Sequence, residues 1–165
     1  MYKKITVFLR LNCKTMDKIK EGLILHCKKF VDDKFQTVKT IMISNQAALQ
    51  SETKSSAGDK HETGRAMLQL EMEKTSTQLN ALNQLKLTLN KIDISGNSKM
   101  ARLGSLVVTS SGNYFLSVSA GKMEISKQVY FAVSLSSPIG KLLLGREIGD
   151  TLHFNGENLN VLNIY

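Results

Sequence analysis

The segment SETKSSAGDKHE, residues 51–62, decides the fold because it interrupts two long runs of helical periodicity. Its small and polar residues, together with Gly58, are typical of a connection between two elements. The chain contains no proline from Met16 to this segment, and only Gly22 among glycines. The sequence therefore predicts two helices that are joined here, with residues 53–62 at the tip of a hairpin.

Apolar residues on both sides of this segment recur at steps of three, four or seven, which is the period of one helix face. They are Ile24, Cys27, Val31, Phe35, Val38, Met42 and Leu49 before it, and Leu68, Met72, Leu79, Leu82, Leu85, Leu89 and Ile92 after it, with Thr75 filling a gap. Neither stripe can be buried alone. We therefore expect an antiparallel coiled-coil hairpin over residues 16–93, with helices roughly 50 Å long.

The remainder of the chain has the composition of a linker followed by short strands. Residues 94–101 are a polar linker, and residues 102–165 contain short apolar runs separated by the turn signals SSGN, SAGK and NGEN. One short helix interrupts these runs, with Ser137 as N-cap, Pro138 at its first position, a Leu142–Leu144 core face and Gly145 as its stop. The predicted fold class is α+β, and the five candidate strands are LGSLVVTS, NYFLSVSA, QVYFAVSL, TLHF and LNVLNIY.

Composition and charge exclude several classes of protein. The chain has 165 residues, 42% of them hydrophobic, and two cysteines, which is too few for a disulfide framework. Half of its net charge of +8 lies in residues 1–15, where Lys3, Lys4, Arg10 and Lys14 face no acid, and basic stripes with aromatics are absent. We expect no sequence-specific DNA binding, signal peptide or membrane span, and we interpret residues 1–15 as an N-terminal extension.

The stretch SPIGKLLLGREIGDTLHF, residues 137–154, resembles the C-terminal domain of the bacterial GreA/GreB transcript cleavage factors. A Gly-Asp-x-x-Glu motif at residues 58–62, at the tip of the predicted hairpin, strengthens the likeness. The resemblance implies an FKBP-like domain over residues 102–165. It covers residues 16–165 in architecture, while its motifs lie in residues 58–62 and 137–150.

The resemblance implies a cytoplasmic, monomeric transcription elongation factor that binds RNA polymerase and is not itself an enzyme. Its hairpin would enter the polymerase's secondary channel, near the 3′ end of the nascent RNA, and stimulate cleavage of backtracked RNA. Asp59 and Glu62 would complete a Mg²⁺ site shared with the polymerase, because two carboxylates are too few to hold the ion alone. Docking would fall on Ser137, Pro138 and Ile139, and the possible tip contacts are Lys60, His61 and Arg65.

Alternatives remain open at this stage. Asp59 followed by Glu62 is also a capping box, which would start the second helix without any metal role. Typical members read Arg-Ser-Glu-Asn-Ala at the tip, whereas this chain has Lys60, His61, Glu62 and Thr63. A polymerase-binding regulator of the same shape without cleavage activity is therefore the first alternative, and only the tip separates the two. An FKBP-like peptidyl-prolyl isomerase or chaperone is a further alternative, and a hydrolase with its own active site is disfavoured because no catalytic constellation stands out.

Overall fold

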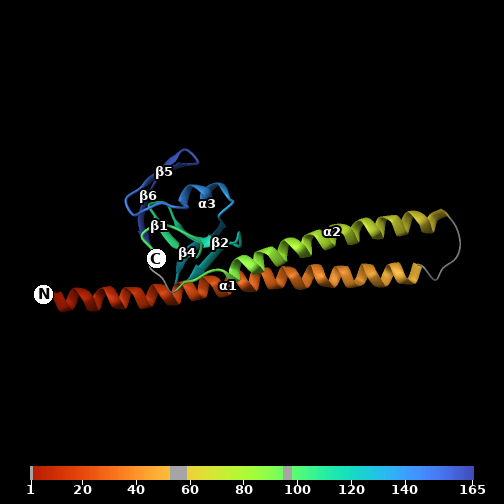
Figure 1. The fold of residues 1–165 in the computed structure, drawn as a ribbon, viewed down its shortest axis with the longest axis horizontal. Helices are drawn as coiled ribbons and strands as arrows, with labels where there is room; N and C mark the ends of the chain where they lie inside the picture. Colours follow the sequence, from red (N-terminus) through yellow and green to blue (C-terminus); the bar gives the residue numbers. More distant parts are fainter. Residues whose placement is uncertain (1, 53–58, 95–97) are drawn as a thin grey trace. The chain divides into compact units, whose positions relative to one another are not determined.

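The computed structural model describes the backbone of residues 2–52, 59–94 and 98–165, and the side chains of these residues from Thr15 onward apart from residues 52 and 59–62. Two long helices, α1 (Tyr2–Glu52) and α2 (Asp59–Asn90), precede a six-stranded sheet and the short helix α3 (Pro138–Leu143), as Figure 1 shows. The predicted α+β class is confirmed. No helix in the described ranges has the length and apolar character needed to cross a membrane.

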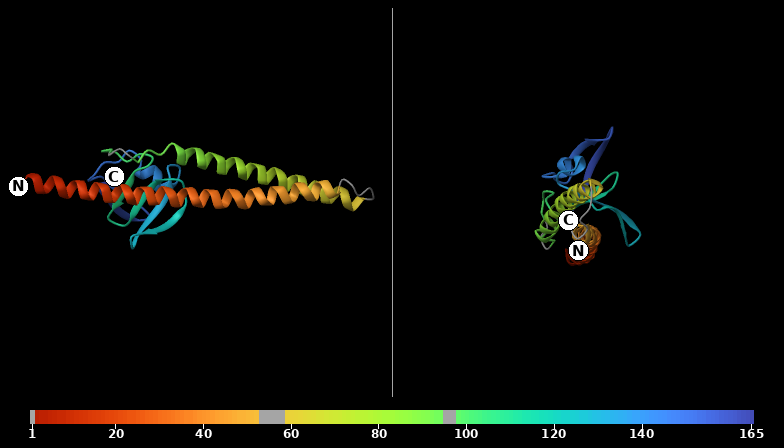
Figure 2. Two further views of the ribbon diagram at one scale, coloured as in Figure 1. Left: turned by 90° about the horizontal axis from the view of Figure 1, so that it is seen from below. Right: turned by 90° about the vertical axis from the view of Figure 1, so that its right-hand side faces the viewer.

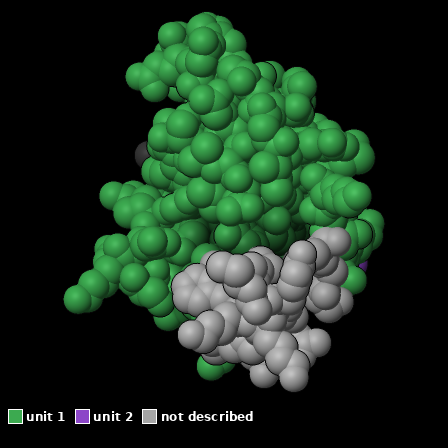
Figure 3. Space-filling model, turned by 90° about the vertical axis from the view of Figure 1, so that its left-hand side faces the viewer, with its two compact units in different colours: residues 1–29, 88–165 green, residues 30–87 purple. Residues whose placement is uncertain are grey.

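The chain forms two compact units, which Figure 3 colours separately. Residues 30–87 form the hairpin unit, made of parts of α1 and α2. Residues 1–29 and 88–165 form the sheet unit, which contains the start of α1 and the end of α2 together with the sheet. The predicted division into residues 1–15, 16–93, 94–101 and 102–165 stays a prediction.

In the hairpin unit α1 and α2 run side by side in opposite directions (Figure 2). Lys86 Nζ lies 2.7 Å from the Asp32 carboxylate and 3.9 Å from the centre of the Phe35 ring. Farther along α1, Val38 lines the same groove as Ala81 of α2. Residue numbers thus rise along α1 as they fall along α2, which makes the pair antiparallel.

The residues of the predicted apolar stripes are shielded from solvent to different degrees. Every stripe residue is buried or half-buried, and Val31 and Thr75 are among the least exposed. Among the apolar residues off the stripes, Ile43 and Met67 are exposed, whereas Leu23 is buried. Thr75 satisfies its hydroxyl within α2, since its Oγ1 donates to Glu71 O at 2.6 Å. Coiled-coil packing of the stripes stays a prediction.

The sheet has the strand order β3-β4-β2-β1-β6-β5, with β2 and β4 parallel and all other neighbours antiparallel. The five predicted strands are present, and a sixth was missed. The bounds are β1 (Leu106–Thr109), β2 (Asn113–Ser117), β3 (Gly121–Ile125), β4 (Gln128–Ser134), β5 (Thr151–Phe154) and β6 (Glu157–Ile164). The missed strand is β3, where SAGK was interpreted as a turn. As an edge strand it buries only Met123 fully, so it lacks a strong apolar alternation.

Both faces of the sheet are covered. On one face a cluster including Val107 and Leu116 packs with Ile139 and Leu143 of α3. Side chains alternate between the faces of a strand, so Ser117 points to the opposite face from Leu116. There its hydroxyl lies 3.6 Å from the sulfur of Cys27 in α1. Burial raises the pKa of the Cys27 thiol, and the hydrogen bond with Ser117 opposes that rise.

Two hairpins of the sheet turn through pairs of residues with positive φ. Asn155 (52°) and Gly156 (84°) connect β5 to β6, and Ser126 (53°) and Lys127 (64°) connect β3 to β4. Such two-residue turns favour Asn-Gly, because only glycine adopts positive φ without steric cost. Positive φ at Ser126 and Lys127 is therefore energetically unfavourable in this turn.

Replacing Lys127 by glycine is expected to raise the free energy of unfolding by about 0.5 kcal/mol, since relief of backbone strain exceeds the added entropy of the unfolded chain. Urea unfolding followed by tyrosine fluorescence measures the change. Lys127→Ala is the control, because alanine removes the same side chain and keeps the strain. Equal stability of the two variants would contradict the turn assignment.

Candidate functional site

The predicted acids lie where the chain enters α2. The helix begins at Asp59, and Glu62 follows three residues later in its first turn, while α1 ends at Glu52. Residues three apart share one face of a helix, and a helix N-terminus favours negative charge. Residues 53–58, which make up much of the predicted tip, lie outside the described residues, as do the side chains of residues 59–62. The capping box and the metal role therefore stay predictions.

The structure describes the side chain of only one of the three predicted tip cations, Arg65. Lys60 and His61 belong to the first turn of α2, and their side chains lie outside the described ones. Arg65 has an exposed side chain one turn after Glu62. Positive charge near the two carboxylates disfavours a cation bound by them alone and favours contact with phosphate.

Magnesium fits the type of these ligands but not their number. Carboxylate oxygens suit the ion, which is commonly held by one or two carboxylates plus groups from a substrate. Among the side chains that the structure describes, no group of three or more histidines, cysteines, aspartates and glutamates lies close enough to hold a metal. Asp59 and Glu62 would therefore need further ligands from a partner.

The predicted docking residues surround the start of α3. Ser137 is the N-cap: its Oγ accepts from Gly140 N at 3.1 Å and donates to Ser134 O at 2.7 Å. Pro138 is exposed at the first helical position, as predicted from its fixed φ. Ile139 is 7% exposed and belongs to the sheet core. Pro138 is thus the most accessible of the three, while Ser137 and Ile139 hold α3 in place.

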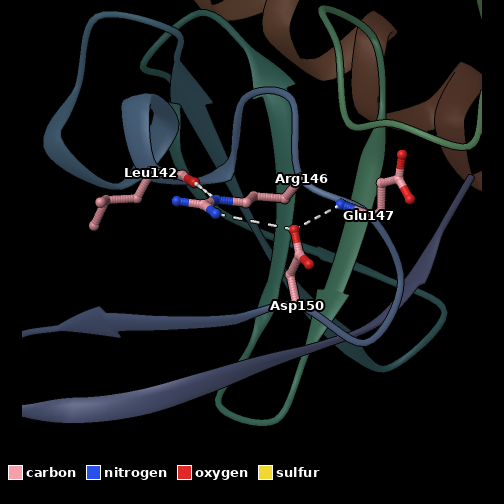
Figure 4. Close-up of polar contacts among 4 residues, drawn as sticks. All are labelled: Leu142, Arg146, Glu147 and Asp150. Carbon is pink, nitrogen blue, oxygen red and sulfur yellow. Dashed lines mark hydrogen bonds and ion pairs between the residues drawn. The ribbon is translucent and has the colours of Figure 1, made fainter.

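The Gly-x-x-x-Gly-Asp part of the resemblance forms a hydrogen-bonded loop after α3 (Figure 4). Asp150 Oδ2 accepts from Glu147 N at 3.1 Å and lies 4.0 Å from Arg146 Nη1. Arg146 Nε also donates to Leu142 O at 3.1 Å. Gly145 and Gly149 have φ of 77° and 96°, which glycine adopts readily. The motif is thus explained by the backbone of the loop and by the carboxylate that ties it together.

A second segment pairs with this loop. Ala101 N donates to Arg146 O, and Gly145 N donates to Ala101 O, each at 2.8 Å, and Met100 pairs with Glu147. We call residues 99–102 and 141–150 the α3–β5 corner. Sequence reasoning missed Met100 and Arg146 as surface candidates, because only the fold brings the polar linker beside the loop.

The α3–β5 corner also corrects the predicted core face of α3. Leu143 is fully buried and Leu142 half-buried, but Leu144 is 46% exposed. Leu144 is the C-cap residue, and its non-helical backbone (φ −59°, ψ 128°) takes it out of the helical register. Three adjacent residues in a helix span about 200° of its circumference, so a helix that is covered on one side cannot bury all three leucines.

The hairpin unit has a cavity of about 500 Å³ between its helices. It is an open groove, lined by Asp33, Lys34, Thr37, Val38, Gln78, Ala81 and Leu82. This lining contains a single carboxylate and no histidine or cysteine, so it offers neither a nucleophile with a base nor a set of metal ligands. The groove does not support a hydrolase.

No protein-family model matches the chain, and no curated protein matches it. The resemblance to GreA/GreB factors therefore depends on residues 58–62 and 137–150 and on the order of the elements. The described backbone has that order: two helices connected near Asp59, followed by a sheet with one short helix.

Proposed function

We propose that this protein is a GreA/GreB-like accessory factor that binds RNA polymerase in the cytoplasm and stimulates cleavage of backtracked RNA. One observation carries the proposal: two carboxylates fall in the first turn of α2, where an antiparallel helical hairpin reverses direction. The sheet unit would be an FKBP-like docking domain, and the hairpin a coiled coil inserted into the secondary channel. The protein would act as a monomer.

The acidic and basic residues of the tip would have different roles. Asp59 and Glu62 would add oxygen ligands to a site whose remaining ligands come from the polymerase and the RNA. A magnesium ion held jointly there would activate water for attack on a phosphodiester. Lys60 and Arg65 would contact RNA phosphate, and a neutral His61 would accept a proton. The polymerase would remain the enzyme, with this protein supplying the missing groups.

A second candidate is a polymerase-binding regulator that occupies the channel without promoting cleavage. It is favoured by the exposed Arg65 near the two acids, because positive charge weakens cation binding at the tip. A peptidyl-prolyl isomerase is less well supported, because Phe115 and Tyr130, at 0% and 2% exposure, serve the core instead of lining a pocket.

The test is release of short 3′ RNA fragments from backtracked RNA polymerase of the same organism. The wild-type protein is expected to accelerate release, and Asp59→Asn and Glu62→Gln to lower this acceleration about 100-fold or more. Loss of one ligand in a shared two-carboxylate set removes much of the electrostatic stabilisation of the transition state. Both substitutions preserve side-chain size, so binding to the polymerase should change little.

Two controls make the result interpretable. Polymerase binding is measured for the same variants, and Glu71→Gln, an exposed acid farther along α2, is expected to retain full cleavage stimulation. Binding of the wild-type protein without faster cleavage would support the non-cleaving regulator. Absence of binding would overturn both candidates.

A further inference from the structure

One side of α2 in the hairpin unit carries a row of residues that leads into the open groove. Five residues succeed one another at steps of four and three: Met67, Glu71, Lys74, Gln78 and Ala81. Residues at these steps lie on one side of a helix. We call these five residues the α2 row. Gln78 and Ala81 line the groove, so the α2 row lies on the side of α2 where the groove opens.

The two ends of the α2 row differ in shape. At one end Met67 is 68% exposed, and Leu70, three residues later, is equally exposed. At the other end Gln78 and Ala81 border the groove, whose lining includes Val38 of α1. Met67 and Ala81 are roughly 21 Å apart along the helix at about 1.5 Å per residue. The row thus has protruding apolar side chains at one end and a cavity at the other.

α1 adds apolar surface beside the groove. Ile41 is 42% exposed and follows the groove residues Thr37 and Val38 by four and three positions. It therefore lies on the same side of α1 as the groove, one turn farther along the helix. Single exposed apolar residues are ordinary, but several of them on one side of a hairpin, next to an open groove, mark an interaction surface.

The middle of the α2 row is an ion pair. Lys74 Nζ lies 3.8 Å from the Glu71 carboxylate, and both side chains are exposed. An exposed pair of this kind adds little to the stability of its own helix. A partner that presents the same two charges in the reverse order would complement both of them.

We propose that the α2 row is a self-association surface on which a second copy of this chain packs in antiparallel orientation. In that orientation Met67 and Leu70 of each copy reach the groove of the other. Glu71 of each copy then lies opposite Lys74 of the other. The occupant is a copy of this chain because the row, when reversed, complements itself at both ends and in the middle.

Such a pairing has the symmetry of a closed homodimer, since the same residues are used on both sides of a two-fold axis. The contact is only a few helical turns long, so we expect a weak and reversible dimer. The inference goes beyond the proposed function and does not rest on it, because self-association needs no polymerase. If the proposed function holds, the dimer would be the unbound form of a protein that acts as a monomer.

Sedimentation equilibrium of the full-length protein over a range of concentrations measures the association. The wild-type protein is expected to show a monomer–dimer equilibrium, and Met67→Ser and Leu70→Ser each to weaken it about tenfold. Leu87→Ser is the matched control. Leu87 is 51% exposed on the same helix but lies about 200° around it from Met67, so the dimer affinity should stay within about twofold of wild type.

The two charges allow a complementation test. Glu71→Lys gives the row two positive charges and Lys74→Glu gives it two negative charges, so each variant alone is expected to dimerise about tenfold more weakly. In an equimolar mixture, opposite charges face one another again, and heterodimers with nearly wild-type affinity are expected. Neither variant has the ion pair within its own helix, so this recovery cannot come from helix stability.

Three results would overturn the inference, once urea unfolding confirms that each variant is folded. The first is a wild-type protein that stays monomeric up to about 1 mM, or that forms a series of larger species, because a two-fold interface closes at two copies. The second is equal affinity of both serine variants and wild type. The third is a mixture that associates no better than its components. None of these results bears on polymerase binding or cleavage, which are measured with polymerase present.

Discussion

Replacing Leu23 by alanine is expected to lower the free energy of unfolding by about 2–5 kcal/mol, the range for deletion of a buried leucine side chain. Leu23 is 0% exposed and lies one helical turn before Cys27, whose sulfur is close to Ser117 of β2. Gly22, the residue before Leu23, also lies close to the sheet, since a Cβ built on it would lie 3.1 Å from Ile125 Cδ1 of β3. Gly22 and Cys27 thus place one face of α1 against the sheet, within the sheet unit.

The measurement is urea unfolding followed by tyrosine fluorescence, which reports the sheet unit through Tyr114 and Tyr130. Leu25→Ala is the matched control, because Leu25 lies on the same helix and is 69% exposed. Its effect is expected to stay within about 0.5 kcal/mol. Equal effects of the two substitutions would show that α1 does not pack on the sheet as described.

Replacing Gly140 by alanine is expected to cost about 3 kcal/mol or more. A Cβ at this position would clash with the carbonyl oxygen of Ser134, a backbone atom at the end of β4. That oxygen accepts the Ser137 hydroxyl, so a shift of either segment would also disturb the N-cap of α3. Overpacking against backbone is costly because no side-chain rotation can relieve it.

Thermal unfolding measures this loss, and Lys141→Ala is the control. Lys141 is the next residue of α3 and is exposed, so alanine there should change stability by at most about 0.5 kcal/mol. If Gly140→Ala unfolded at the wild-type temperature, the close approach of α3 to β4 would be disproved.

The two helices from Met16 onward were predictable because their signal is local, whereas the start of α1 at Tyr2 was not predicted. Each stripe repeats over many turns, so a single exposed apolar residue off the stripe, such as Ile43, does not obscure the pattern. β3 was not predictable, because an edge strand with exposed Lys122 and Glu124 has the composition of a turn. The parallel pairing of β2 with β4 is also invisible in sequence, since it places β3 at the edge and β4 inside.

The candidate site was predictable where a motif lies within one element. Asp59 and Glu62 do fall in the first turn of α2, as their spacing suggested. The exposure of individual apolar residues was harder to predict, because Ile139 and Ile148 are both apolar residues near glycines in the sequence. Only the packing of α3 shows that the first is buried in the core and that the second is exposed.

The pairing of β1 with β6 has a consequence for synthesis on the ribosome. β1 lies between β2 and β6, and Leu106 exchanges two backbone hydrogen bonds with Tyr165, at 2.9 and 3.0 Å. One edge of β1 therefore stays unpaired during synthesis until β6 has left the exit tunnel. Such long-range pairing is slow to form and leaves strand edges open to aggregation. A nascent chain interrupted before Glu157 would lack β6, the strand that pairs with both β1 and β5.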